Sequence, residues 1–91
     1  MNYLLVATEH GFDTSQISKL SENDSLILLI AVERVQLTGD FESKMKKHVS
    51  DAEHLQKQLK LKNIVSKVLV EWDAPTNLIT NCLAREEAIL L

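Results

Sequence analysis

The sequence predicts an α/β fold, a small open parallel sheet with helices on both faces. Apolar runs typical of strands alternate along the chain with segments whose apolar residues recur at helical spacing. Short connections and right-handed crossovers then place four strands side by side in a Rossmann-like arrangement, in an order like 3-2-1-4. No linker or shift in composition divides residues 1–91, so we expect a single domain.

Four apolar segments are the predicted strands. Leu26–Val32 contains no polar residue, which is typical of a strand covered on both faces. Tyr3–Ala7 is a continuous apolar run of the same kind. Val65–Trp72 is rich in β-branched residues and predicts a buried strand, and Ala88–Leu91 predicts a short last strand.

Three segments between these strands predict helices. The longest is Phe41–Leu61, in which apolar residues recur every three or four positions. A shorter helix begins at Pro75, because proline suits a first helical turn, and its apolar stripe is Leu78, Ile79, Cys82 and Leu83. A short helix is also expected before Leu26, with capping residue types at Asp13, Thr14 and Ser15 and apolar residues at Ile17 and Leu20.

Charge and cysteine content narrow the functional classes. The formal net charge of −3 argues against a nucleic-acid binder, which is usually basic. Cys82 is the only cysteine, so no intrachain disulfide forms, and we expect a reducing, cytoplasmic location. The first nine residues lack the positive region of a signal peptide, and Leu26–Val32 is too short to span a bilayer, so no membrane association is expected.

The order and spacing of these elements resemble the universal stress protein family. Leu4–Glu9 is similar to the first strand of that family, Ile27–Glu33 to its second, and Ala74-Pro75 to the turn before its next helix. The resemblance implies a stress-response protein with a Rossmann-like sheet, and it covers the first four of the family's five strands. ATP-binding members carry a Gly-rich phosphate loop after strand four, and the 91 residues end before such a loop, so the resemblance implies a shortened relative.

Three acidic residues follow the predicted strands and define a candidate site. Glu9, Glu33 and Asp73 would meet at the sheet edge where open α/β folds bind ligands, and clustered carboxylates can hold Mg²⁺. Solvated acidic residues near helix N-termini are the alternative interpretation, and we weigh it more heavily. A nucleotide (ATP or AMP) or Mg²⁺ would contact Thr8, Glu9, His10, Gly11, Ala31, Glu33 and Asp73.

The remaining reactive side chains favour structural roles. His48 and His54 are six residues apart and do not share a helix face, so no metal site is predicted. Cys82 lies on an apolar stripe and is expected to be buried and inert. Trp72 ends a strand, where it would stack on a base or, as we favour, pack at the core rim or an interface.

The size of the chain motivates the functional prediction. A domain of 91 residues buries a modest share of its surface, and a short last strand would leave a sheet edge to cover. We therefore expect a non-enzymatic regulatory or protein-interaction domain that needs no cofactor. It would form a homodimer around Ala88–Leu91 or through the helix after Pro75, and contact a partner protein. Nucleotide or Mg²⁺ binding is the alternative function, and a hydrolase using the same acidic residues is a third, for which no nucleophile motif is present.

Overall fold

The fold was analysed in a computed structural model that describes residues 1–8, 11–32 and 41–91. Strands and helices follow the order expected from the sequence, and the bounds of the four strands and of the longest helix agree with the predicted ones to within one residue. In chain order they are β1 (Asn2–Val6), the 3-10 helix η1 (Ile17–Lys19), β2 (Ser25–Val32), α1 (Phe41–Leu61), β3 (Val65–Trp72), α2 (Pro75–Arg85) and β4 (Ile89–Leu90).

The four strands form one parallel sheet in the order β3-β2-β1-β4, which confirms the predicted topology. Leu4 of β1 lies opposite Ile27 of β2, and Leu28 of β2 lies opposite Val68 of β3. At the far side, Tyr3 of β1 lies opposite Ile89 of β4. The two inner strands are therefore β1 and β2, and the eight-residue β3 and the two-residue β4 form the edges.

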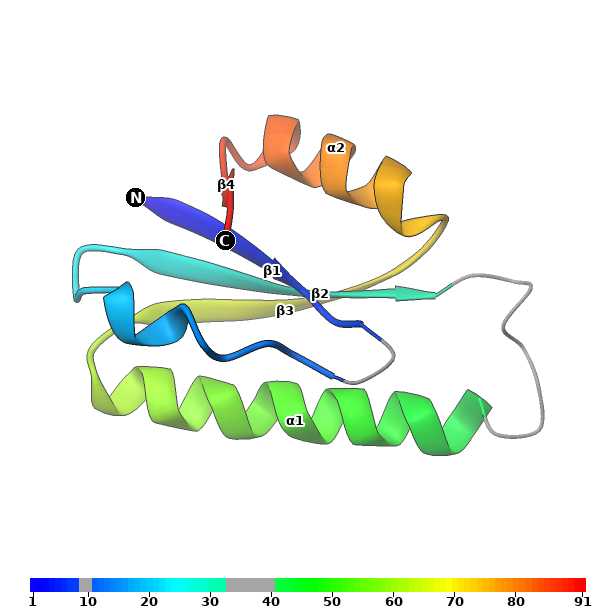
Figure 1. Cartoon of the computed structure of the whole chain (residues 1–91), viewed down its shortest axis with the longest axis horizontal. Coiled ribbons are helices and arrows are strands. Elements are labelled where there is room, and N and C mark those ends of the chain that lie inside the picture. Colours follow the sequence, from blue (N-terminus) through cyan, green and yellow to red (C-terminus); the bar gives the residue numbers. More distant parts are fainter. Residues whose placement is uncertain (9–10, 33–40) are drawn as a thin grey trace.

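Helices cover both faces of the sheet, as predicted. Figure 1 shows α1 beneath the sheet, on the same side as η1, and α2 above it. Side chains point alternately to the two faces of a strand, so each strand contributes to both layers. Apolar residues of β2 are accordingly buried on both sides, from Leu26 to Ile30.

Two apolar clusters make up the core. The cluster under α1 combines Ala52, Leu55 and Leu59 of the helix with Leu5 and Leu28 of the sheet. The cluster under α2 consists of Leu4, Ile27, Leu29, Leu78 and Cys82. Both helical stripes expected from the sequence therefore face the sheet.

Two details of the predicted fold are wrong. The short helix expected before β2 is only the single 3-10 turn of η1, although Ile17 and Leu20 are buried as expected. The strand β3 is not buried, since Val65 and Trp72 are 73% and 61% exposed. Its β-branched residues indicated a strand, but its place at the sheet edge leaves it without a second strand neighbour.

None of the helices described is both long and apolar enough to cross a membrane.

Candidate functional site

Thr8 and Gly11 form hydrogen bonds with each other just beyond the carboxyl end of β1. The N–H of Thr8 donates to the carbonyl of Gly11 at 2.9 Å, and the N–H of Gly11 donates to the carbonyl of Thr8 at 3.0 Å. The Thr8 hydroxyl also donates to the Gly11 carbonyl, at 3.2 Å. Both N–H groups at the ends of this turn are therefore used within the turn and do not point at a ligand.

Gly11 meets two requirements of this turn. Its φ of +96° is a conformation that residues with a side chain rarely adopt. A Cβ added there would lie 3.3 Å from Oδ2 of Asp51 on α1, which is a tight contact. Gly11 is therefore explained by backbone conformation and close approach to α1.

The other proposed ligand-binding residues do not form a cluster in the part of the chain that the structure describes. Asp73 is exposed, and its Oδ1 accepts hydrogen bonds from the N–H of Ala74 at 2.7 Å and from Nδ2 of Asn77 at 3.4 Å. It thus stabilises the entry to α2. Ala31 packs against the core cluster under α2.

Glu9, His10 and Glu33 lie outside the described residues, so the three-carboxylate site stays a prediction. Within residues 1–8, 11–32 and 41–91, no group of three or more His, Cys, Asp or Glu side chains is arranged to hold a metal ion.

Cys82 and the helix histidines occupy structural positions. Cys82 is fully buried, as expected, and burial raises the pKa of its thiol, which keeps it in the unreactive protonated form. His54 is exposed on α1. His48 is half-buried, and no described residue donates to or accepts from its buried Nδ1.

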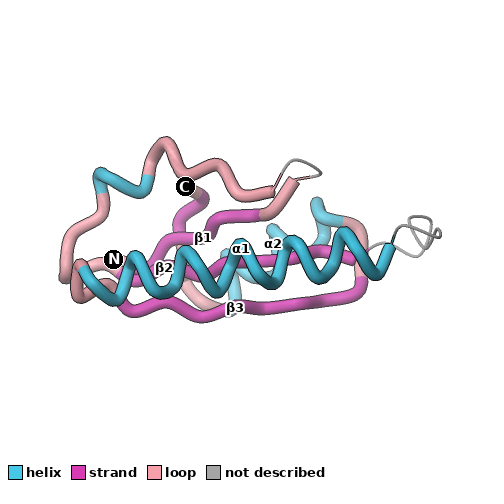
Figure 2. The backbone as a smooth tube through the Cα atoms, turned by 90° about the horizontal axis from the view of Figure 1, so that it is seen from below, coloured by secondary structure: helices cyan, strands magenta, loops and turns pink. Residues whose placement is uncertain are grey.

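Both outer strands of the sheet present exposed apolar side chains, and the two most exposed belong to β3. Val65, Val70 and Trp72 are 73%, 43% and 61% exposed. On the opposite edge of the sheet, Ile89 and Leu90 of β4 are 44% and 50% exposed. We call strand Val65–Trp72, including the side that faces away from β2, the β3 edge. Figure 2 shows it running along the margin of the sheet, beside α1.

Charged side chains line the α2-facing side of the β3 edge. Nζ of Lys67 lies 3.0 Å from Oε2 of Glu86, and a guanidinium nitrogen of Arg85 lies 3.1 Å from Oε1 of Glu71. The hydrogen bond from Lys67 lowers the pKa of Glu86, and the hydrogen bond to Glu71 raises the pKa of Arg85. Both shifts favour the charged forms of Glu86 and Arg85.

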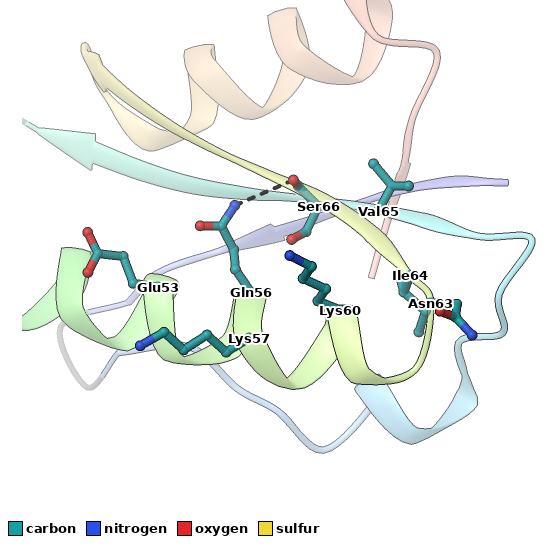
Figure 3. Close-up of a pocket in the computed structure, with 8 residues that line it drawn as sticks. All are labelled: Glu53, Gln56, Lys57, Lys60, Asn63, Ile64, Val65 and Ser66. Atoms are coloured by element: carbon teal, nitrogen blue, oxygen red, sulfur yellow. Dashed lines mark hydrogen bonds between the residues drawn. The ribbon is translucent and has the colours of Figure 1, made fainter.

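A groove of about 690 Å³ lies between α1 and the first residues of β3 (Figure 3). On its strand side, the carbonyl of Ser66 accepts a hydrogen bond from Nε2 of Gln56 at 3.4 Å. On its helix side, Lys57 and Lys60 supply positive charge. The groove is lined by Glu53, Gln56, Lys57, Lys60, Asn63, Ile64, Val65 and Ser66.

The sequence interpretation overlooked this surface because β3 was taken as buried. One signal was present: the strand contains two charged residues, Lys67 and Glu71, on the same side of the strand and at equal distances from Leu69. Charged residues on alternate positions of a strand indicate one solvated face.

No protein-family model, curated protein or solved structure matches the chain. The similarity to universal stress proteins therefore rests on the strand and turn residues quoted above and stays a prediction.

Proposed function

We propose that the chain is a non-enzymatic protein-interaction domain that acts by associating with itself. The observation that carries this proposal is the exposed apolar side chains on both outer strands, Val65, Val70 and Trp72 on β3 and Ile89 and Leu90 on β4. Outer strands with unpaired backbone groups pair readily with another chain, and apolar side chains beside them favour that pairing.

The geometry favours β3 over the surfaces expected from the sequence. The strand β4 has two residues, against eight in β3, so it offers few backbone hydrogen bonds. The helix α2 directs Leu78 and Cys82 into the core and leaves mostly polar residues exposed. Of the three surfaces, only β3 combines length, apolar exposure and a neighbouring groove.

The test is the molecular mass in solution, measured by analytical ultracentrifugation. A contact confined to one strand and its surroundings is small, so we expect dimers with a dissociation constant on the order of 10 µM. The fraction of dimer should rise with protein concentration. A single species of monomer mass up to about 500 µM, far above that constant, would contradict the proposal.

A further inference from the structure

We propose that the partner of the β3 edge is β3 of a second copy, paired antiparallel about a two-fold axis beside Leu69. This inference rests on the proposed self-association and adds the surface, the strand direction and the register. The argument uses the direction of backbone groups, the placement of charge along β3, and the groove beside it.

The backbone of β3 presents hydrogen-bonding groups to the open side at even-numbered positions. The carbonyl of Leu29 in β2 accepts a hydrogen bond from the N–H of Ala7, which follows β1. Backbone groups alternate in direction along a strand, so odd-numbered residues of β2 form hydrogen bonds with the β1 side and even-numbered residues form them with β3. In a pair of parallel strands, a residue whose N–H and C=O point toward the neighbouring strand lies opposite a residue whose N–H and C=O point away from it. Since Leu28 lies opposite Val68 and Ile30 opposite Val70, both valines direct their N–H and C=O outward.

Ser66 agrees with this assignment, because its carbonyl accepts from Gln56 on α1. No strand among the described residues pairs with the outward side of β3, whose only neighbour in the sheet is β2.

Antiparallel pairing centred on Leu69 gives the outward-facing backbone groups hydrogen-bond partners and places opposite charges next to each other. Val68 of each copy lies opposite Val70 of the other, and these outward-facing residues exchange hydrogen bonds. Lys67 of each copy lies opposite Glu71 of the other, in the closely spaced non-hydrogen-bonded positions where cross-strand side chains contact most directly. A shift of two residues in either direction keeps the backbone bonds but loses both ion pairs.

The charge pattern identifies the occupant as a second copy. A two-fold interface must be self-complementary, and β3 carries one cation and one anion placed symmetrically about Leu69 on the same face. Each is already paired within its own chain, Lys67 with Glu86 and Glu71 with Arg85. Dimerisation joins these pairs into a row of alternating charges across the interface.

The groove beside β3 accommodates the side chain that would otherwise clash. In this register Trp72 of one copy lies opposite Ser66 of the other, so the largest side chain faces a small one. Ser66 lines the groove of about 690 Å³, together with Lys57 and Lys60 on α1 (Figure 3). The indole would enter that groove and lie near these ammonium groups, which favour aromatic faces.

Charge exchange tests the register. Lys67→Glu and Glu71→Lys each place like charges opposite one another at two sites, so each variant alone should dimerise at least tenfold more weakly than the unaltered protein. An equimolar mixture of the two restores both opposite-charge pairs, and heterodimer should form with near-normal affinity. Lys19→Glu, which changes an exposed lysine of η1, is the matched control and should leave dimerisation unchanged.

Disulfide cross-linking is a second, independent test of the proposed strand register. Leu69→Cys places two thiols opposite each other on the two-fold axis, so mild oxidation should give a disulfide-linked dimer, whereas Ser66→Cys should not cross-link. Cys82 is buried and does not interfere. Trp72 is the only tryptophan, so its emission should shift to shorter wavelength as concentration rises and the indole leaves water.

The outcomes separate this inference from the proposed function. Dimers that persist unchanged in both charge variants, or that form without cross-linking Leu69→Cys, would overturn the β3 register while self-association stands. Failure of the mixture to dimerise, with each variant folded by circular dichroism, would also overturn it. A purely monomeric unaltered protein would overturn both proposals.

Discussion

Single residues of this chain are explained by local geometry more often than by ligand chemistry. Gly11 lies in a segment that the alternative, nucleotide-binding interpretation of the sequence uses, yet its N–H bonds to the carbonyl of Thr8 and its missing Cβ lets Asp51 approach. Asp73 follows a strand as a ligand would, yet its carboxylate accepts the Ala74 N–H. Both residue types are common in turns for the same conformational reasons, so their presence alone does not distinguish a site from a turn.

Replacement of Gly11 tests this account at the residue scale. Gly11→Ala should lower the free energy of unfolding by about 1–3 kcal/mol, because alanine is strained at a φ of +96°. Chemical denaturation measures the effect. Ser18→Ala, at an exposed position of η1, is the control and should change stability by less than about 0.5 kcal/mol.

The same substitution in an Asp51→Ala background separates strain from contact. Removing the Asp51 carboxylate relieves the 3.3 Å approach but not the backbone conformation, so most of the loss should remain. An unchanged stability in Gly11→Ala would show that the turn adopts another conformation.

The strands and helices are positioned by hydrogen bonds in the turns at their ends as well as by packing in the apolar core. The turn before β2 is closed by Asp24, whose Oδ2 accepts the N–H of Ser21 at 2.9 Å and its hydroxyl at 3.3 Å. The backbone hydrogen bond from Ser21 is the main reason why the pKa of Asp24 lies below its ordinary value. This turn directs Ser25 into the first position of β2, opposite Asn2 of β1.

The lowered pKa predicts how stability depends on pH. A carboxyl group with a lower pKa in the folded state stabilises that state at pH above its unfolded pKa, and this contribution disappears as pH falls through the folded pKa. Asp24→Asn should therefore lower the melting temperature at about pH 7, and the difference from the unaltered protein should shrink toward about pH 3.

Thermal unfolding followed by circular dichroism across this pH range measures the difference. Glu22→Gln removes a carboxylate from the same exposed turn and is the control. A difference between Asp24→Asn and the unaltered protein that stays constant with pH would contradict the assigned role of the charge.

In the part of the chain that the structure describes, the molecule is a sheet with α1 and η1 on one face and α2 on the other, and exposed apolar side chains lie on its two outer strands. The two core clusters bury Leu4 and Leu5 of β1 and most of β2, whereas β3 has half-exposed or exposed side chains along its length. A further strand added at an edge would bury these exposed apolar side chains and pair the backbone groups of the outer strand. This supports an interaction domain rather than a ligand-binding one.

Ligand binding is tested on the same protein by thermal shift. We expect ATP, AMP and Mg²⁺, separately and together, to leave the melting temperature unchanged, because neither glycine of the 91 residues belongs to a phosphate-binding loop. A ligand present at a hundredfold excess over its dissociation constant would stabilise the fold by about 2.7 kcal/mol. A shift of that size would support the alternative site at Glu9, Glu33 and Asp73 instead.

The predicted fold is confirmed where hydrophobic periodicity is strong. Leu26–Val32 and Phe41–Leu61 are a buried strand and a long amphipathic helix, as their patterns indicate. The segment around Ile17 shows the opposite case. Its apolar residues reach the core, but a single 3-10 turn is enough to bury them, and spacing alone does not distinguish the two.

The sequence by itself determined the four strands and the two α-helices, and that the strands run parallel, because apolar periodicity and short connections permit few other arrangements. Only the tertiary structure decided how much of β3 is exposed, that Lys67 and Glu71 pair with Glu86 and Arg85 at the end of α2, and that a groove lies beside Ser66. These features depend on contacts between residues distant in the chain. A local pattern records the preference of a segment for a strand, but not how completely its neighbours cover it.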